Sequence, residues 1–178
     1  LTGSPSLTAR LAVVEGLPYL MFGLVSGALS DRLDRRQVMV LADLVAAVVI
    51  ASVPLAHWFG SLTAAHALAA GFLAQSAFVF FDGAAFGALP AIVGRDRIGE
   101  ANAAIWGVGS FLDLGVPMLA GVLLAVIDPA VLLGLDALSF ALSAWCVAGI
   151  RTRLSEDRGA VPKLRPRVLA AEVAEGLR

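Results

Sequence analysis

Apolar residues occur along this chain in five long runs separated by short polar segments. The runs cover residues 11–29, 38–56, 63–89, 101–127 and 130–150. A helix needs about 20 apolar residues to cross the roughly 30 Å hydrocarbon core of a bilayer. The pattern therefore predicts an all-α protein in which residues 1–150 form a bundle of about five membrane-spanning helices.

The alternative interpretation of such runs is a soluble protein with fully buried helices. Composition argues against it, because 59% of the 178 residues are hydrophobic and only 15% are charged, with a mean hydropathy of +0.87. A soluble domain is about 45–50% apolar and about 25% charged. The apolar excess is too large for one core, so most of it is expected to face lipid.

The chain after residue 150 has a different character from the five runs. Residues 151–178 are basic and contain proline, and they end in a stretch at 169–177 with an apolar helical face. We expect this part to be a cytoplasmic linker with a short amphipathic helix.

Basic residues lie almost entirely on one side of the predicted bundle. Of the 13 Lys and Arg residues, 12 lie between the first and second runs, between the third and fourth, or after the fifth. Because positive charge is enriched in cytoplasmic loops, we expect residue 1 outside and residue 178 inside. The predicted location is the plasma (inner) membrane, with multiple passes.

The chain offers little for enzyme chemistry or metal binding. Its net charge of −1 does not indicate a nucleic-acid partner. The single cysteine, Cys146, and the two histidines, His57 and His66, lack the spacing of a metal site. No nucleophile with a base and no phosphate-binding loop accompanies them. The sequence therefore predicts no enzyme, no metal and no cofactor.

The first polar segment carries the most informative motif. Residues 26–37 read SGALSDRLDRRQ. This stretch resembles the cytoplasmic loop between the second and third helices of major facilitator superfamily transporters, where the usual pattern is Gly-x-Leu-Ala-Asp-Arg-x-Gly-Arg-Arg. The matching residues are Gly27, Leu29, Asp31, Arg32, Arg35 and Arg36. Ser30 replaces the alanine, and Asp34 stands where the superfamily has glycine.

Three further stretches resemble the same superfamily, in the order of its helices. They are residues 80–103 (fourth helix and its exit loop), 114–124 (fifth-helix motif of antiporters) and 135–144 (sixth helix). The branch resembled contains the enterobactin exporter and macrolide efflux proteins. The resemblance implies a partial N-terminal half, helices two to six of twelve, whose partner is the missing remainder of the transporter.

The resemblance also implies a gating role for the loop motif, because the aspartate matching Asp31 helps to hold the cytoplasmic side closed in the superfamily. In physical terms, Gly27 would let two helices approach closely, and Asp31 would favour a positive helix end. The alternative is that Arg32, Arg35 and Arg36 only anchor the loop to anionic lipid head groups.

Each predicted span contains an acidic residue, and none contains Lys or Arg. The acids are Glu15, Asp43, Asp82, Asp113 and Asp136. An ionisable residue inside a membrane usually faces a cavity or a partner, and a carboxyl group there can bind a proton. Asp113, near the middle of its span, is the first proton or substrate candidate and Asp82 the second. The alternative for each is a structural hydrogen bond between helices.

Pro117 lies within the fourth run, between Gly115 and Gly121. Proline removes a backbone hydrogen bond and can bend a helix. In the antiporters that this stretch resembles, the bend seals the cavity against leak; the alternative is a fixed kink with no role in transport.

These features together predict part of an efflux transporter. The expected activity is proton-coupled export of a drug, macrolide or siderophore by alternating access between two halves of the whole transporter. The expected partners are the lipid bilayer, a small-molecule substrate and protons. The alternative is a membrane scaffold or assembly subunit without transport of its own.

Overall fold

The computed structural model describes residues 5–30, 32–152 and 154, and this part of the chain is helical. The elements are α1 (Pro5–Ser30), α2 (Arg35–Trp58), α3 (Ala64–Val93), the short 3-10 helix η1 (Arg95–Arg97), α4 (Ile98–Val126) and α5 (Pro129–Ala148). The prediction of an all-α protein with five long helices is confirmed. The short helix predicted at 169–177 lies outside the described residues.

Four of the described helices are long and apolar enough to cross a membrane: α2, α3, α4 together with η1, and α5. In α1, the apolar part that the structure describes is shorter and covers Gly16–Ser30. These lengths fit a protein that crosses the bilayer several times.

Most helices begin or end at a residue whose local chemistry explains the boundary. Side chains accept hydrogen bonds from the first turns of α2, α3 and α5: Asp34 from the Gln37 backbone (3.1 Å), Thr63 from His66 (3.2 Å) and Asp128 from Ala130 (2.7 Å). Such caps satisfy backbone N–H groups that have no partner within the helix. Helix α3 ends at Gly94, whose φ of +82° is readily adopted only by glycine.

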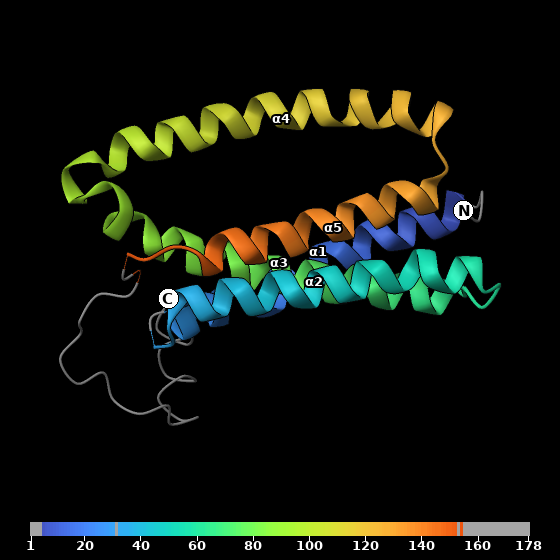
Figure 1. Cartoon of the computed structure of the whole chain (residues 1–178), viewed down its shortest axis with the longest axis horizontal. Helices are drawn as coiled ribbons and strands as arrows, with labels where there is room; N and C mark the ends of the chain where they lie inside the picture. The colour runs from blue at the N-terminus through green and yellow to red at the C-terminus, as the bar shows by residue number, and fades with distance from the viewer. Residues whose placement is uncertain (1–4, 31, 153, 155–178) are drawn as a thin grey trace.

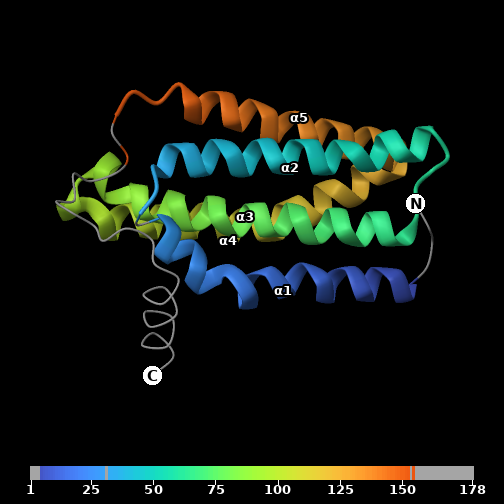
Figure 2. The same ribbon diagram turned by 90° about the horizontal axis from the view of Figure 1, so that it is seen from below.

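Four of the helices lie side by side in the order α5, α2, α3 and α1, and they form one layer (Figure 2). Helix α4 lies apart from this layer and connects the end of α3 to the start of α5 (Figure 1). Its main contacts are with α3 and η1 near its own start. None of its side chains is buried.

The helices of the layer pack through small side chains. Ala42 and Ala46 of α2 meet Ala77 of α3 in one cluster. Ala84 and Ala88 of α3 are fully covered in a second cluster. Small residues let helix backbones approach closely, and such packing drives helix association in lipid.

We call the two ends of the layer the arginine end and the opposite end. The arginine end holds the α1–α2 turn, η1 and the described residues 149–152 and 154. The opposite end holds the α2–α3 turn and the α4–α5 turn. Near the opposite end, Ser52 Oγ and His66 Nε2 are 2.9 Å apart and join α2 to α3.

Candidate functional site

The side chain of Arg35 is buried between helices at the arginine end. It is only 5% exposed. Its Nη1 donates a hydrogen bond to the backbone oxygen of Leu154 at 3.2 Å. The guanidinium also lies against Gly87 of α3, where an added Cβ would be 2.8 Å from Nε. Arg35 therefore joins the start of α2 to α3 and to the segment that follows α5.

The neighbouring arginine makes a similar contact from the surface. Nη1 of Arg36 donates a hydrogen bond to the backbone oxygen of Ile150 at 2.8 Å. Ile150 lies beyond the end of α5, which spans Pro129–Ala148, and a charged donor makes a stronger hydrogen bond to such a carbonyl than a neutral donor does. Arg35 and Arg36 thus bind backbone oxygens beyond the end of α5, which gives these two arginines of the motif protein partners in addition to any lipid head groups.

Asp34, which departs from the superfamily pattern, has a clear structural role. Its carboxylate caps α2 through the Gln37 backbone N–H. A glycine at this position would have no side chain to accept that bond. The spacing of a capping residue and Gln three positions later is a signal that the sequence already contained.

Of the remaining motif residues, the structure describes Gly27 and Arg32. Gly27 is exposed on α1, and a Cβ built there would meet no atom within 4 Å. The close approach expected at Gly27 is instead made by its neighbour Ser26 against Gly83 of α3, where an added Cβ would be 2.9 Å from the hydroxyl oxygen. Arg32 is half-buried. Asp31 lies outside the described residues.

The two acids favoured from the sequence lie on different helices and are both exposed. Asp82 of α3 lies near Tyr19 of α1, close enough for an electrostatic interaction. Asp113 lies on α4, away from the layer. Within the described part of the chain, the structure does not bring these two carboxylates together, and no group of three or more His, Cys, Asp or Glu could hold a metal.

Asp113 belongs to a stripe of α4 that differs from the rest of that helix. Asn102, Gly109, Asp113 and Pro117 are spaced by seven, four and four residues, which places them along one face. Helix α4 continues through Pro117 without interruption. Gly115 and Gly121 have open surroundings, because a Cβ at either position would meet no atom within 4 Å.

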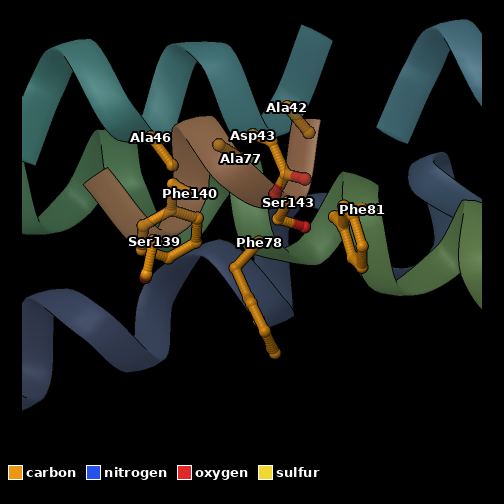
Figure 3. A pocket seen from close by; sticks show the side chains of 9 residues that line it. All are labelled: Ala42, Asp43, Ala46, Ala77, Phe78, Phe81, Ser139, Phe140 and Ser143. Atoms are coloured by element: carbon orange, nitrogen blue, oxygen red, sulfur yellow. The ribbon is translucent and has the colours of Figure 1, made fainter. Parts of the chain in front are cut away.

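One acid that sequence reasoning ranked lower is buried in the layer. Asp43 of α2 is 4% exposed and lines a cavity of about 140 Å³ between α2, α3 and α5 (Figure 3). Ser143 of α5 is within hydrogen-bonding reach of its carboxyl group. The sequence contained a polar stripe of Asp136, Ser139 and Ser143 along the last predicted span, but that stripe does not indicate which residue of another helix it meets.

Comparison with known protein families decides the class of this chain. The model of the transmembrane secretion effector family, MFS_3, matches residues 1–178. The chain belongs to this family of major facilitator superfamily transporters. The resemblance carried by the sequence motifs is therefore confirmed. Membership also makes the chain a multi-pass membrane protein of a transporter family, not an enzyme.

The curated relatives of this family member are efflux proteins. The multidrug efflux pump Tap of Mycobacterium tuberculosis (strain ATCC 25618 / H37Rv) is 29% identical over 185 residues. Macrolide efflux protein A of Streptococcus pyogenes is 24% identical over 176 residues. Each match covers 99% of this chain but 43% of the relative, so the chain spans less than half the length of these relatives. No solved structure matches the chain.

Proposed function

We propose that this chain is part of the N-terminal half of an exporter that moves small molecules out of the cell by proton-coupled alternating access. The observation that carries the proposal is the family match over the whole chain, together with relatives named as efflux proteins. In such transporters, two halves rock about a substrate site near the middle of the membrane. A drug, a macrolide or a siderophore is the proposed class of substrate.

The proposed orientation places the arginine end in the cytoplasm, with residue 1 outside and residue 178 inside the plasma membrane. The support is the positive charge that this end carries, because basic loops remain on the cytoplasmic side. The domain division is proposed in the same way, with a bundle over residues 1–150 and a cytoplasmic linker over 151–178.

The loop motif of Gly27, Asp31, Arg32, Arg35 and Arg36 is proposed to form part of the cytoplasmic gate. Arg35 and Arg36 bind the backbone beyond α5, so the α1–α2 turn and the end of α5 are held together. A gate needs such a rigid unit, because alternating access is largely a rigid-body movement. The exposed Gly27 leaves a smooth surface on α1 that another helix could approach.

Asp113 is proposed to bind the coupling proton or a cationic group of the substrate, with Asp82 as the second candidate. Both are exposed in the described part of the chain. An acid on an otherwise apolar helix costs about 2.5–3.5 kcal/mol at the bilayer centre. That cost supports the view that the stripe of α4 with Asp113 faces water or protein, not lipid. Gly115, Pro117 and Gly121 are proposed to set the bend of this helix.

The test uses the full-length transporter in everted membrane vesicles, with a fluorescent lipophilic cation as the probe. Asp113→Asn is expected to reduce proton-driven efflux by about tenfold or more, which corresponds to about 1.4 kcal/mol of lost stabilisation. Asp82→Asn should have a smaller effect. Asp96→Asn, in the exposed 3-10 helix η1, is the matched control and should leave efflux unchanged. Wild-type efflux in Asp113→Asn vesicles would remove Asp113 from the mechanism.

A further inference from the structure

Asp43 has the most enclosed side chain among the acids that the structure describes. Its exposure is 4%, whereas Asp82, Asp113 and Asp136 are all exposed. It lies eight residues into α2 from Arg35, which is about 12 Å along the helix axis. Figure 3 shows its carboxyl group directed toward Ser143 across the cavity between α2, α3 and α5.

The walls of this cavity are almost entirely apolar. The lining side chains without polar atoms are Ala42, Ala46, Ala77, Phe78, Phe81 and Phe140. The two lining hydroxyl groups belong to Ser139 and Ser143. Ser139 Oγ donates to the backbone oxygen of Asp136 at 2.8 Å. That bond directs the Ser139 hydroxyl to its own helix and leaves Ser143 as the partner of Asp43.

The Asp43 carboxylate is only partly satisfied by these neighbours. Its Oδ2 is buried and has no hydrogen-bond partner among the described residues of the protein, so the Ser143 hydroxyl serves the other carboxylate oxygen. A buried charge without a cation or a full set of hydrogen bonds is strongly unfavourable. Binding a proton removes that charge, and the site therefore has a physical reason to exchange protons.

Among the described residues of α2, α3 and α5, no charged side chain is found to act on Asp43. On α2, the Arg35 guanidinium lies against Gly87 and Leu154. On α3, Asp82 is exposed and interacts with Tyr19 of α1. On α5, Asp136 lies seven residues before Ser143 and is exposed. The residues that line the cavity include no other ionisable side chain.

We infer that Asp43 is a proton-binding site located between α2, α3 and α5. A proton taken from water adds to Oδ2, and the carboxylate becomes a neutral carboxyl group. Its new O–H bond points into the cavity, where a water molecule can accept a hydrogen bond. The volume of about 140 Å³ has room for water, because one molecule needs about 10–15 Å³ of such space. The Ser143 hydroxyl continues to donate to the other oxygen.

A metal cation fits this cavity less well than a proton. The side-chain oxygens directed into it are those of Asp43 and Ser143, and hard cations such as calcium take six to eight oxygen ligands. The helix backbone carbonyls around the cavity already accept bonds within their own helices. The donor set is therefore sufficient for a proton and a few water molecules only.

This site goes beyond the proposed function, which assigns proton or substrate binding to Asp113 and Asp82. Its use in transport rests on that proposed function, but proton binding by Asp43 does not. The experiment therefore measures protonation directly, by infrared difference spectroscopy of the full-length protein in liposomes between about pH 5 and pH 9. Dye efflux is measured separately in the same liposomes.

The expected result is a carboxyl C=O band that appears at low pH in the wild type and is lost in Asp43→Asn. Asp136→Asn, an exposed acid on α5, is the matched control and should keep this band. Ser143→Ala retains the carboxyl group but removes its donor, so the band should shift to higher frequency. This second variant tests the site even if Asp43→Asn does not fold.

Two results would overturn the inference. One is a pH-dependent spectrum that is unchanged by Asp43→Asn, or by Ser143→Ala where the first variant does not fold. The other is loss of the low-pH band when sodium chloride replaces choline chloride, which would indicate a cation site. Loss of the band in Asp43→Asn with normal dye efflux supports proton binding and shows only that transport does not need it. Absence of efflux in the wild type would count against the proposed function and leave the band as evidence.

Discussion

Helices α2 and α4 are both long and apolar, yet their surroundings in this chain are opposite. Helix α2, with 24 residues, lies inside the layer and buries eight side chains. Helix α4, with 29 residues, buries none. Each carries one acid within its apolar stretch, and Asp43 is enclosed whereas Asp113 is exposed.

The difference shows that apolar composition does not define which surface packs against protein. In lipid, an apolar side chain is equally well accommodated by a neighbouring helix or by acyl chains. Both helices contain small residues, but those of α2 are buried against α3, and α2 also makes polar contacts, such as Asp43 with Ser143 and Arg35 with the backbone of Leu154. The contacts of α4 are few, so its role depends on what covers the stripe with Asp113.

The largest expected effect comes from removing the side chain that fixes α2 at the arginine end. Arg35→Ala leaves the Leu154 carbonyl without its charged donor and empties the space over Gly87. We expect a loss of about 2–3 kcal/mol in folding free energy, seen as a lower thermal unfolding midpoint of the full-length protein in detergent.

Arg36→Ala is the control for that variant, because Arg36 makes a similar backbone contact from an exposed position. Its cost should stay below about 1 kcal/mol, as for exposed charged contacts in general. Equal shifts for the two variants would show that burial of Arg35 contributes nothing.

A second pair of variants compares a packed helix with α4 directly. Gly83→Ala places a methyl group 2.9 Å from Ser26 Oγ and 3.4 Å from the Ser26 carbonyl carbon. Helices α1 and α3 would have to separate, at a cost of about 1–3 kcal/mol. Gly121→Ala on α4 meets no atom within 4 Å and should be neutral or stabilising by up to about 1 kcal/mol.

The measurement is again the thermal midpoint, combined with the yield of monodisperse protein on size-exclusion chromatography. If Gly121→Ala lowered the thermal midpoint as much as Gly83→Ala, the space that is open around Gly121 in this chain would be occupied by another helix in the full-length protein. That result would locate a close helix contact at Gly121.

The smallest effect concerns how the two helices begin. Helix α2 is capped by the Asp34 carboxylate, whereas α4 begins after Arg97 without a side-chain cap. Asp34→Ala should cost about 1 kcal/mol, and Asp34→Asn should restore most of it. Arg97→Ala, which removes an exposed 3.3 Å ion pair with Glu100, should change the midpoint little. A midpoint unaffected by Asp34→Ala would mean that packing alone holds this end of α2.

Most of the fold could be predicted from the sequence, but less of the candidate functional site could be. The five apolar runs correspond to the five long helices, because a helix with internally satisfied backbone is the form that such runs adopt in lipid. The family was also readable from short motifs around Asp31 and Pro117. The pairing of Asp43 with Ser143 was not found, because the two residues are a hundred positions apart and belong to different runs.

The sequence by itself determined the helices, the caps such as Asp34, and the membership of a transporter family. These depend on local spacing and on apolar length, which can be read without knowing any neighbour. Only the tertiary structure decided that Arg35 enters the space beside Gly87 and that Asp43 is enclosed while Asp113 is not. The physical reason is that lipid and helix partners are both apolar, so burial of one face is set by close packing between segments distant in the chain.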